Sequence, residues 1–119
     1  DITLEAIKTD DLATLELKNF DVILIDEGQF FTNLKTEVEK MLEQNLTVIV
    51  AGLNGDFNMN KFGEMIDLVP IADNIIYLQA NCYNCDDKAS FTKRISSEEQ
   101  VVSVNSSYVP SCRKCHSIP

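Results

Sequence analysis

The apolar positions along the chain recur at two spacings, and together they predict an alternation of helices and strands. Near the start, apolar residues close to helical spacing predict a helix over residues 3–18, which Asp10 and Asp11 are expected to interrupt. The apolar run VILI, residues 22–25, is typical of a strand buried on both faces of a parallel sheet. In the helix predicted over residues 3–18, the apolar residues near helical spacing are Leu4, Ile7, Leu12 and Leu15.

A second helix is predicted over residues 32–45, because its apolar residues share one face. Thr32 or Asn33 can cap its start, and Asn45 is expected to end it. Residues 46–53 then read as a second buried strand. The order strand, helix, strand predicts a right-handed parallel crossover. In the helix predicted over residues 32–45, the shared apolar face consists of Leu34, Val38, Met41 and Leu42.

From Gly52 onward the pattern changes to a loop rich in Gly and Asn. A short helix that Pro70 stops is expected next, followed by a third strand over residues 74–80. Residues 81–119 hold few large aliphatic side chains, so the sequence places a domain boundary near residue 80. The prediction is an α/β domain over residues 1–80 and a small lobe over residues 81–119.

Composition excludes some classes of function. Among 119 residues, Asp and Glu number 19 against 10 Lys and Arg, which gives a net charge of −9. Such a charge repels nucleic acid and anionic membranes, so neither is expected as a partner. The apolar runs are too short to span a bilayer. The start of the chain does not read as a signal peptide. It also lacks an initiator Met, so we expect that a segment upstream of Asp1 is missing from this sequence.

Two CxxC pairs are the most specific spacing in the chain. They are Cys82 with Cys85 and Cys112 with Cys115, and four thiolates complete the closed tetrahedron of a structural zinc site. A disulfide pair would suit a secreted chain, and a redox role would leave one pair without a purpose, so zinc is the favoured interpretation. His116 is expected to be a bystander, because four thiolates already saturate the ion.

Asp26 and Glu27 come directly after the first predicted strand. Open α/β sheets bind ligands at the carboxyl ends of their strands. In nucleotide hydrolases and kinases the first acid there holds Mg²⁺, and a neighbouring acid can accept a proton from the nucleophile. The alternative is that these acids only begin a loop and cap the next turn of the chain.

Five further segments follow one another along the chain: DEGQFF, TVIVAGLNGDFNMNKFGEMIDLVPIADNI, CYNC, ASFTKRI and CRKC. Taken in this order, they resemble the thymidine kinase family of the zinc-bearing cellular and poxviral type. The resemblance runs from about residue 20 to residue 115, with a short gap between Asn105 and Tyr108, and it is weaker over residues 1–19.

The resemblance implies roles for residues around the two acids. Glu27 matches the general base, and Asp26 matches the acid that holds Mg²⁺, usually through water. Gln29 is assigned to the cofactor side of the site, beside the nucleoside. The residues expected to wall the nucleoside pocket are Phe30, Leu53, Phe57 and Phe62.

The resemblance also implies how the base is bound. Phe57 would stack on the thymine ring, while Thr92 and Tyr108 would line the region around the 5-methyl group. A lasso loop would bind the pyrimidine edge with its backbone; it consists of Val101, Val102, Ser103, Val104 and Asn105. From composition alone, Phe57 and Phe62 could be core aromatics, Thr92 a strand-surface residue and Tyr108 a residue packed on a cysteine pair.

One departure from the family is clear. The family needs a GxxxxGK(S/T) loop that cradles the ATP phosphates, and this sequence has none. We therefore expect the chain to be the C-terminal part of a larger kinase. The implied fold is an incomplete, parallel P-loop-kinase-like sheet flanked by helices, with a small C-terminal zinc-ribbon-like lobe.

The implied activity is transfer of the ATP γ-phosphoryl to the 5′-hydroxyl of thymidine, giving the monophosphate for nucleotide salvage. Structural Zn²⁺ and Mg²⁺ with ATP are the implied cofactors, and the fragment alone is expected to be inactive without its phosphate loop. A cytoplasmic homotetramer with feedback by dTTP is a further expectation from the family. The alternatives are a non-catalytic zinc-ribbon interaction module on a degenerate nucleotide-binding fold and, less favoured, a fragment of a P-loop ATPase.

Overall fold

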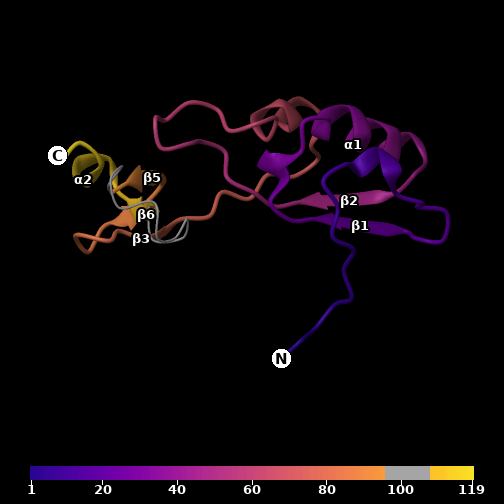
Figure 1. Ribbon diagram of the computed structural model, residues 1–119, viewed down its shortest axis with the longest axis horizontal. Coiled ribbons are helices and arrows are strands. Elements are labelled where there is room, and N and C mark those ends of the chain that lie inside the picture. Colours follow the sequence, from indigo (N-terminus) through magenta and orange to yellow (C-terminus); the bar gives the residue numbers. More distant parts are fainter. Residues whose placement is uncertain (96–107) are drawn as a thin grey trace. The chain divides into compact units, whose positions relative to one another are not determined.

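The computed structural model describes residues 1–95 and 108–119, and its ribbon is shown in Figure 1. The chain divides into two compact units. The first unit consists of Asp1–Leu53 and Gly63–Ile71, and the second of Asn54–Phe62 and Ala72–Pro119. The predicted assignment of functions to residues 1–80 and 81–119 stays a prediction. The predicted lasso loop, residues 101–105, lies outside the described residues.

The first unit is built on two parallel strands, β1 (Val22–Ile25) and β2 (Thr47–Val50). Val22 lies opposite Thr47, and the register continues to Ile25 opposite Val50. The helix α1 (Leu34–Glu43) connects the two strands and lies along one side of them (Figure 1). The predicted order of strand, helix and parallel strand is therefore confirmed.

Helix α1 buries the face that the sequence predicts, with one exception. Leu34, Val38 and Met41 are all at most 5% exposed and form the core with Leu12, Ile25 and Leu68. Leu42 is predicted on this face but is exposed, because at about 100° per residue it falls at the edge of the apolar stripe. Asn45 adopts a positive φ of 62°, a conformation that commonly ends helices.

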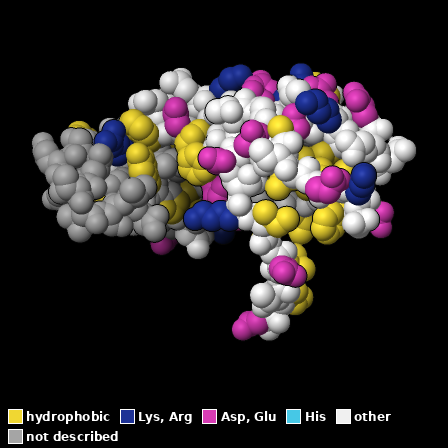
Figure 2. Space-filling view, turned by 45° about the vertical axis from the view of Figure 1, so that its right-hand side comes forward, with side chains coloured by type: hydrophobic (Ala, Val, Ile, Leu, Met, Phe, Trp, Pro, Cys, Tyr) yellow, Lys and Arg dark blue, Asp and Glu magenta, His cyan; other side chains and the backbone are white. Residues whose placement is uncertain are grey.

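The prediction that the strands are buried on both faces is wrong. Leu24 and Ile49 are each 55% exposed, whereas Ile25 is buried. Within the described part of this unit, α1 packs on one face of the two-stranded sheet and the other face stays open. Figure 2 shows hydrophobic side chains gathered below α1, on the side where β1 and β2 lie.

The predicted helix over residues 3–18 does not form. A short 3₁₀ helix, η1 (Leu12–Thr14), takes its place, and Ile7 is 70% exposed. The Oδ1 atom of Asp11 accepts a hydrogen bond from the backbone N–H of Ala13 and so caps η1. Asp side chains compete in this way with helix formation, and the predicted interruption thus becomes the start of a single short turn.

Two later predictions are also wrong. The third strand over residues 74–80 is not formed: Ile76 and Leu78 are more than 80% exposed, and pairing starts at β3 (Ala80–Asn81). The short helix is the 3₁₀ helix η3 (Ile66–Ile71), which contains Pro70 instead of ending before it. The other 3₁₀ helix of the first unit is η2 (Gly28–Phe30).

The described residues of the second unit form two antiparallel pairs of strands. β3 pairs with β4 (Lys88–Ala89), and β5 (Phe91–Arg94) pairs with β6 (Tyr108–Ser111). A single-turn helix, α2 (Arg113–His116), comes after β6. Among the described residues of this unit, the buried cluster is small and consists of three cysteines and one alanine: Cys82, Ala89, Cys112 and Cys115.

Candidate functional site

The turn after β1 carries the two predicted acids. Glu27 has φ 53° and ψ 46°, a left-handed conformation that is uncommon for residues other than glycine. Asp26 supports this turn, because its Oδ1 accepts a 2.9 Å hydrogen bond from the backbone N–H of Glu27. Such backbone conformations cost on the order of 1–3 kcal/mol and persist where the surroundings determine them. Both side chains are exposed at the end of the strand.

Gln29 determines where the Glu27 carboxylate lies. Its Nε2 donates to Oε2 of Glu27 over 2.6 Å, and its Oε1 accepts from the backbone N–H of Leu53 over 3.0 Å. The side chain is only 4% exposed. The two ends of one buried amide therefore join the acid after β1 to the chain that leaves β2. The family resemblance assigns Gln29 to cofactor binding and does not indicate this contact.

Glycines make room for this amide. A Cβ on Gly52 would lie 2.5 Å from Oε1 of Gln29 and 3.0 Å from the backbone nitrogen of Gly28. Gly63 has φ +57°, and a Cβ there would overlap the carbonyl of Gln29. A side chain at position 52 would push the Gln29 amide aside, and one at position 63 would collide with the backbone of Gln29 in a conformation that favours glycine.

The loop of residues 54–62 in the second unit is held by its own polar groups. Oδ1 of Asp56 accepts from the backbone N–H groups of Asn58 and Asn60 over 2.9 and 3.1 Å. Gly55 and Lys61 form an antiparallel bridge across the loop. This closed loop presents Phe57, the residue predicted to stack on the base.

Phe57 lies within a small group of side chains from β5 and β6. Its ring centroid is 6.0 Å from that of Tyr108, and the guanidinium carbon of Arg94 lies 5.1 Å from the Phe57 centroid. Phe57 is half-buried and Tyr108 is 39% exposed, so an aromatic surface with a cation beside it remains accessible. Arg94 was not predicted here; its position two residues after Thr92 on one strand is the pattern that could have indicated it, because alternate residues share a face.

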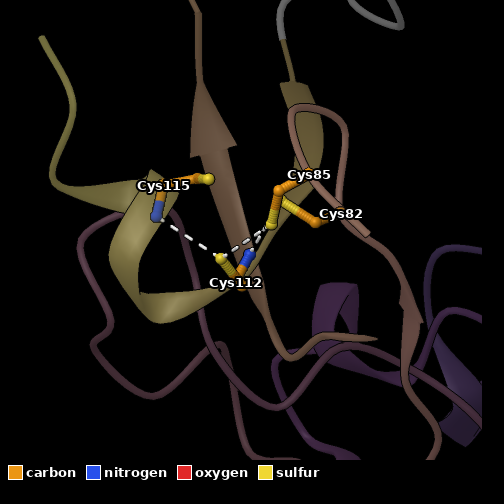
Figure 3. A group of neighbouring side chains, drawn as sticks. All are labelled: Cys82, Cys85, Cys112 and Cys115. Carbon is orange, nitrogen blue, oxygen red and sulfur yellow. Dashed lines mark hydrogen bonds between the residues drawn. The ribbon is translucent and has the colours of Figure 1, made fainter. Parts of the chain in front are cut away.

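The four cysteines of the second unit converge, and Figure 3 shows their side chains pointing toward one another. Their sulfurs all lie within 4.8 Å of one another, and those of Cys85 and Cys112 are 3.7 Å apart. A tetrahedral zinc–thiolate site has Zn–S bonds of about 2.3 Å, which places its sulfurs about 3.8 Å apart. All four cysteines are free, so the cluster can hold a metal ion and its geometry fits zinc. His116 is not part of the cluster.

Backbone N–H groups already point at these sulfurs. Cys112 donates to Sγ of Cys82 over 3.3 Å, and Cys115 donates to Sγ of Cys112 over 3.4 Å (Figure 3). Burial acts to raise the pKa of Cys82, but backbone donors at Asn84, Cys112 and Cys85 outweigh it and lower the pKa to about 6. Such donors stabilise thiolates, which are the form that binds a metal.

The pKa of Cys85 is shifted in the opposite direction. A backbone N–H at Asp87 acts to lower its pKa, but desolvation and the hydrogen bonds with the other three thiols raise it to about 12. Cys82 therefore ionises more readily than Cys85. Because a tetrahedral thiolate site needs both in the thiolate form, metal binding to this cluster releases protons.

Sequence comparisons identify the family of the chain that carries this site. The family model described as "Thymidine kinase" matches residues 2–116. The chain belongs to the thymidine kinase family. The thymidine kinase of vaccinia virus (strain Ankara) is 37% identical over 115 residues, which are 95% of this chain and 64% of the relative.

Two other thymidine kinases are similarly related. The "Thymidine kinase, cytosolic" of Gallus gallus is 42% identical over 97 residues, covering 80% of this chain and 43% of the relative. The monkeypox virus thymidine kinase is 37% identical over 102 residues, covering 84% and 58%. The chain thus spans about two thirds or less of the length of these relatives.

Seen as a thymidine kinase family member, the chain holds its predicted site residues in two groups. The first unit brings together Asp26, Glu27, Gln29 and Leu53, with Phe30 exposed at the end of η2. The second unit groups Phe57 with Tyr108, while Thr92 lies on β5 and Phe62 donates its backbone N–H to the carbonyl of Asn54 within the loop.

None of the described helices has the length and hydropathy that crossing a membrane requires.

Proposed function

We propose that the protein is a thymidine kinase that transfers the γ-phosphoryl group of ATP to the 5′-hydroxyl of thymidine. The observation that carries this proposal is the Glu27 carboxylate, exposed at the end of β1 and held by the buried amide of Gln29. The family to which the chain belongs supports the choice of thymidine as substrate.

Glu27 would act as the general base. As the 5′-oxygen bonds to the γ-phosphorus and the bond to the bridging oxygen of ADP breaks, Oε1 or Oε2 of Glu27 takes the hydroxyl proton. The hydrogen bond from Gln29 fixes one oxygen and leaves the carboxylate in one orientation. A fixed base loses less entropy at the moment of reaction than a mobile one.

Asp26 would hold Mg²⁺ directly or through water. Its exposed carboxylate is the type of oxygen ligand that Mg²⁺ prefers. When bound, Mg²⁺ with ATP supplies neutralisation of the phosphoryl charge. Gln29, which the family resemblance assigns to cofactor binding, acts in this proposal by holding Glu27.

The thymine ring would stack on Phe57. The partly exposed ring of Phe57 beside Tyr108 supports this role, and Thr92 and Tyr108 would lie around the 5-methyl group. Phe30, Leu53 and Phe62 would complete the nucleoside pocket. Val101, Val102, Ser103, Val104 and Asn105 stay the predicted lasso loop at the pyrimidine edge.

We also propose that the cysteine cluster holds one structural Zn²⁺. Zinc would supply no chemistry to phosphoryl transfer. It would stabilise a unit whose buried cluster is mostly cysteine, by joining the β3–β4 end of the unit to the start of α2.

The remaining expectations concern the whole protein. A P-loop-kinase-like sheet, a homotetramer, feedback by dTTP and a cytoplasmic location are proposals that rest on the family. The name of the chicken relative, a cytosolic enzyme, agrees with the last of these. A non-catalytic interaction module is less well supported, since both acids and the amide that holds one of them are present.

The deciding experiment is an assay of the full-length protein with ATP, Mg²⁺ and labelled thymidine. The expected product is thymidine monophosphate, and a Glu27→Gln variant should bind thymidine but form little product. Thymidine binding without phosphorylation by the wild-type protein would favour the non-catalytic module instead.

A further inference from the structure

We propose that His116 is a positioning residue for thymidine, which ties the backbones of Phe57 and Thr92 to the helix that carries Cys115. The proposal deepens the proposed function and rests on it. It concerns a residue that the sequence marked only as a bystander of the metal cluster, and all the groups involved belong to the second unit.

One ring nitrogen of His116 contacts two backbone carbonyls. Nε2 lies 3.0 Å from the oxygen of Phe57 and 3.1 Å from the oxygen of Thr92. A carbonyl oxygen can only accept, so Nε2 carries the hydrogen and shares it between both. A single donor therefore holds together the loop that presents Phe57 and the strand that presents Thr92.

The imidazole is itself held in place. Its ring packs edge-on against Phe91, with centroids 6.2 Å apart and planes inclined by 67°. The backbone N–H of His116 donates to the carbonyl of Cys112 over 2.9 Å. His116 thus reaches the pocket residues from a turn anchored at the cysteine cluster.

Lys93 fixes the same turn from the side of β5. The side chain of Lys93 is 9% exposed, and its Nζ donates to the carbonyl of Cys115 over 3.0 Å and to the carbonyl of Ile118. Since Lys93 comes directly after Thr92, α2 is joined to β5 at two adjacent residues. These contacts therefore hold the His116 ring in one position relative to Thr92.

The consequence is for the shape of the base site. The hydrogen bond to the carbonyl of Phe57 holds the backbone from which the phenyl ring projects. The hydrogen bond to the carbonyl of Thr92 holds the residue whose side chain is expected beside the 5-methyl group. Without the shared N–H, the loop of residues 54–62 keeps the hydrogen bonds made by Asp56 but loses this tie to β5. Thymidine should then bind less tightly, while ATP, which uses other groups, should not be affected.

The test compares three variants of the full-length, zinc-loaded enzyme. His116→Phe keeps a ring but removes the donor, His116→Gln keeps an N–H at a similar reach, and Ser117→Ala is a control that removes another hydrogen bond of the same turn, from Oγ to the carbonyl of Lys114. We expect His116→Phe to raise the KM for thymidine on the order of 3–10-fold, the range for one lost hydrogen bond. The KM for ATP and the zinc content should stay at wild-type values, His116→Gln should recover most of the loss, and Ser117→Ala should show none.

Amide hydrogen exchange over residues 54–62 gives a second readout that does not depend on thymidine. It should be faster in His116→Phe than in wild type or Ser117→Ala. Unchanged exchange and an unchanged KM would overturn the proposal, and so would loss of zinc in both His116 variants with equal effects on both substrates. A wild-type protein that phosphorylates no thymidine would overturn the proposed function, whereas the exchange data would separately show whether His116 holds the loop.

Discussion

The side chain of Gln29 holds the carboxylate of Glu27 through a 2.6 Å hydrogen bond. The same amide accepts from the backbone N–H of Leu53, so the acid after β1 is placed by the chain that leaves β2. This buried bridge fixes the Glu27 carboxylate in the turn after β1, and it leads to a specific prediction.

Gln29→Met should lower turnover without abolishing thymidine binding. Methionine fills a similar volume but neither donates to Glu27 nor accepts from Leu53, whose N–H then lacks this partner at a cost of about 1–3 kcal/mol of stability. We expect kcat to fall about 10-fold, in line with the loss of one or two hydrogen bonds that orient the base. Steady-state kinetics and urea unfolding measure the two effects. Gln44→Met, the same substitution at an exposed residue after α1, is the control and should change neither.

Gly52→Ala should disturb the same bridge from the opposite side. Its Cβ would lie 2.5 Å from Oε1 of Gln29, so the amide must move away from Leu53. Gly55→Ala is a matched control, because a Cβ there meets its nearest atom at an ordinary 3.5 Å. We expect a loss of about 1–3 kcal/mol in the free energy of unfolding for Gly52→Ala, the usual range for overpacking. Equal stability of the two variants would show that the Gln29 amide is not confined.

The sequence predicts those elements whose pattern is local. The helix after β1 and the parallel pair around it are predicted by apolar periodicity, and the cysteine cluster is predicted by two CxxC spacings. The prediction of a strand over residues 74–80 fails because an apolar run does not by itself specify a pairing partner. In the described residues, strand pairing begins only at Ala80.

The contacts that organise the candidate site were hidden for a related reason. The role of Gln29 depends on a backbone N–H at Leu53, and that of His116 on carbonyls at Phe57 and Thr92. Backbone groups carry no sequence signature, so a side chain that binds them over a long separation cannot be recognised from residue types. Family resemblance implied candidate residues for a nucleoside pocket but did not indicate the side chains that hold their backbones.

Phe57→Ala should weaken nucleoside binding by about 1–3 kcal/mol, the range found when a stacking aromatic is removed from beneath a base. ATP affinity should barely change. Phe20→Ala, at a residue that is 51% exposed in the first unit, serves as the control and should leave both affinities unaltered. Calorimetric titration of each ligand measures them. Equal losses for thymidine and ATP would mean that the substitution unfolds the loop, and that Phe57 has no stacking role.

Metal removal should affect the two units differently. We expect one Zn²⁺ per chain, and its removal by a chelator should speed amide exchange over residues 81–95 and 108–119 while β1 and β2 stay protected. The reason is that the second unit buries mostly cysteine, whereas the first has an apolar core around α1. Because binding requires thiolates, zinc should also be lost as the pH is lowered. Metal analysis of freshly purified protein that finds no zinc would contradict this prediction.

The last prediction separates the two acids. Glu27→Gln keeps the shape of the side chain but removes its basic lone pair, so turnover should fall on the order of 10²–10⁴-fold, the usual range for a positioned base. Asp26→Asn should instead raise the Mg²⁺ concentration that is needed for half-maximal rate, because it removes a charged oxygen ligand. Thymidine binding should be nearly unchanged in both variants.

The measurement is turnover as a function of Mg²⁺ concentration, with thymidine binding determined separately. The geometry explains why the acids should differ: Glu27 is held by the amide of Gln29, whereas Asp26 contacts the backbone N–H of Glu27 and lies exposed. A base benefits from a fixed position, and a carboxylate that binds hydrated Mg²⁺ must remain accessible to water. If added Mg²⁺ restores Glu27→Gln and leaves Asp26→Asn unchanged, the two roles are reversed, and the hydrogen bond from Gln29 orients a metal ligand instead of a base.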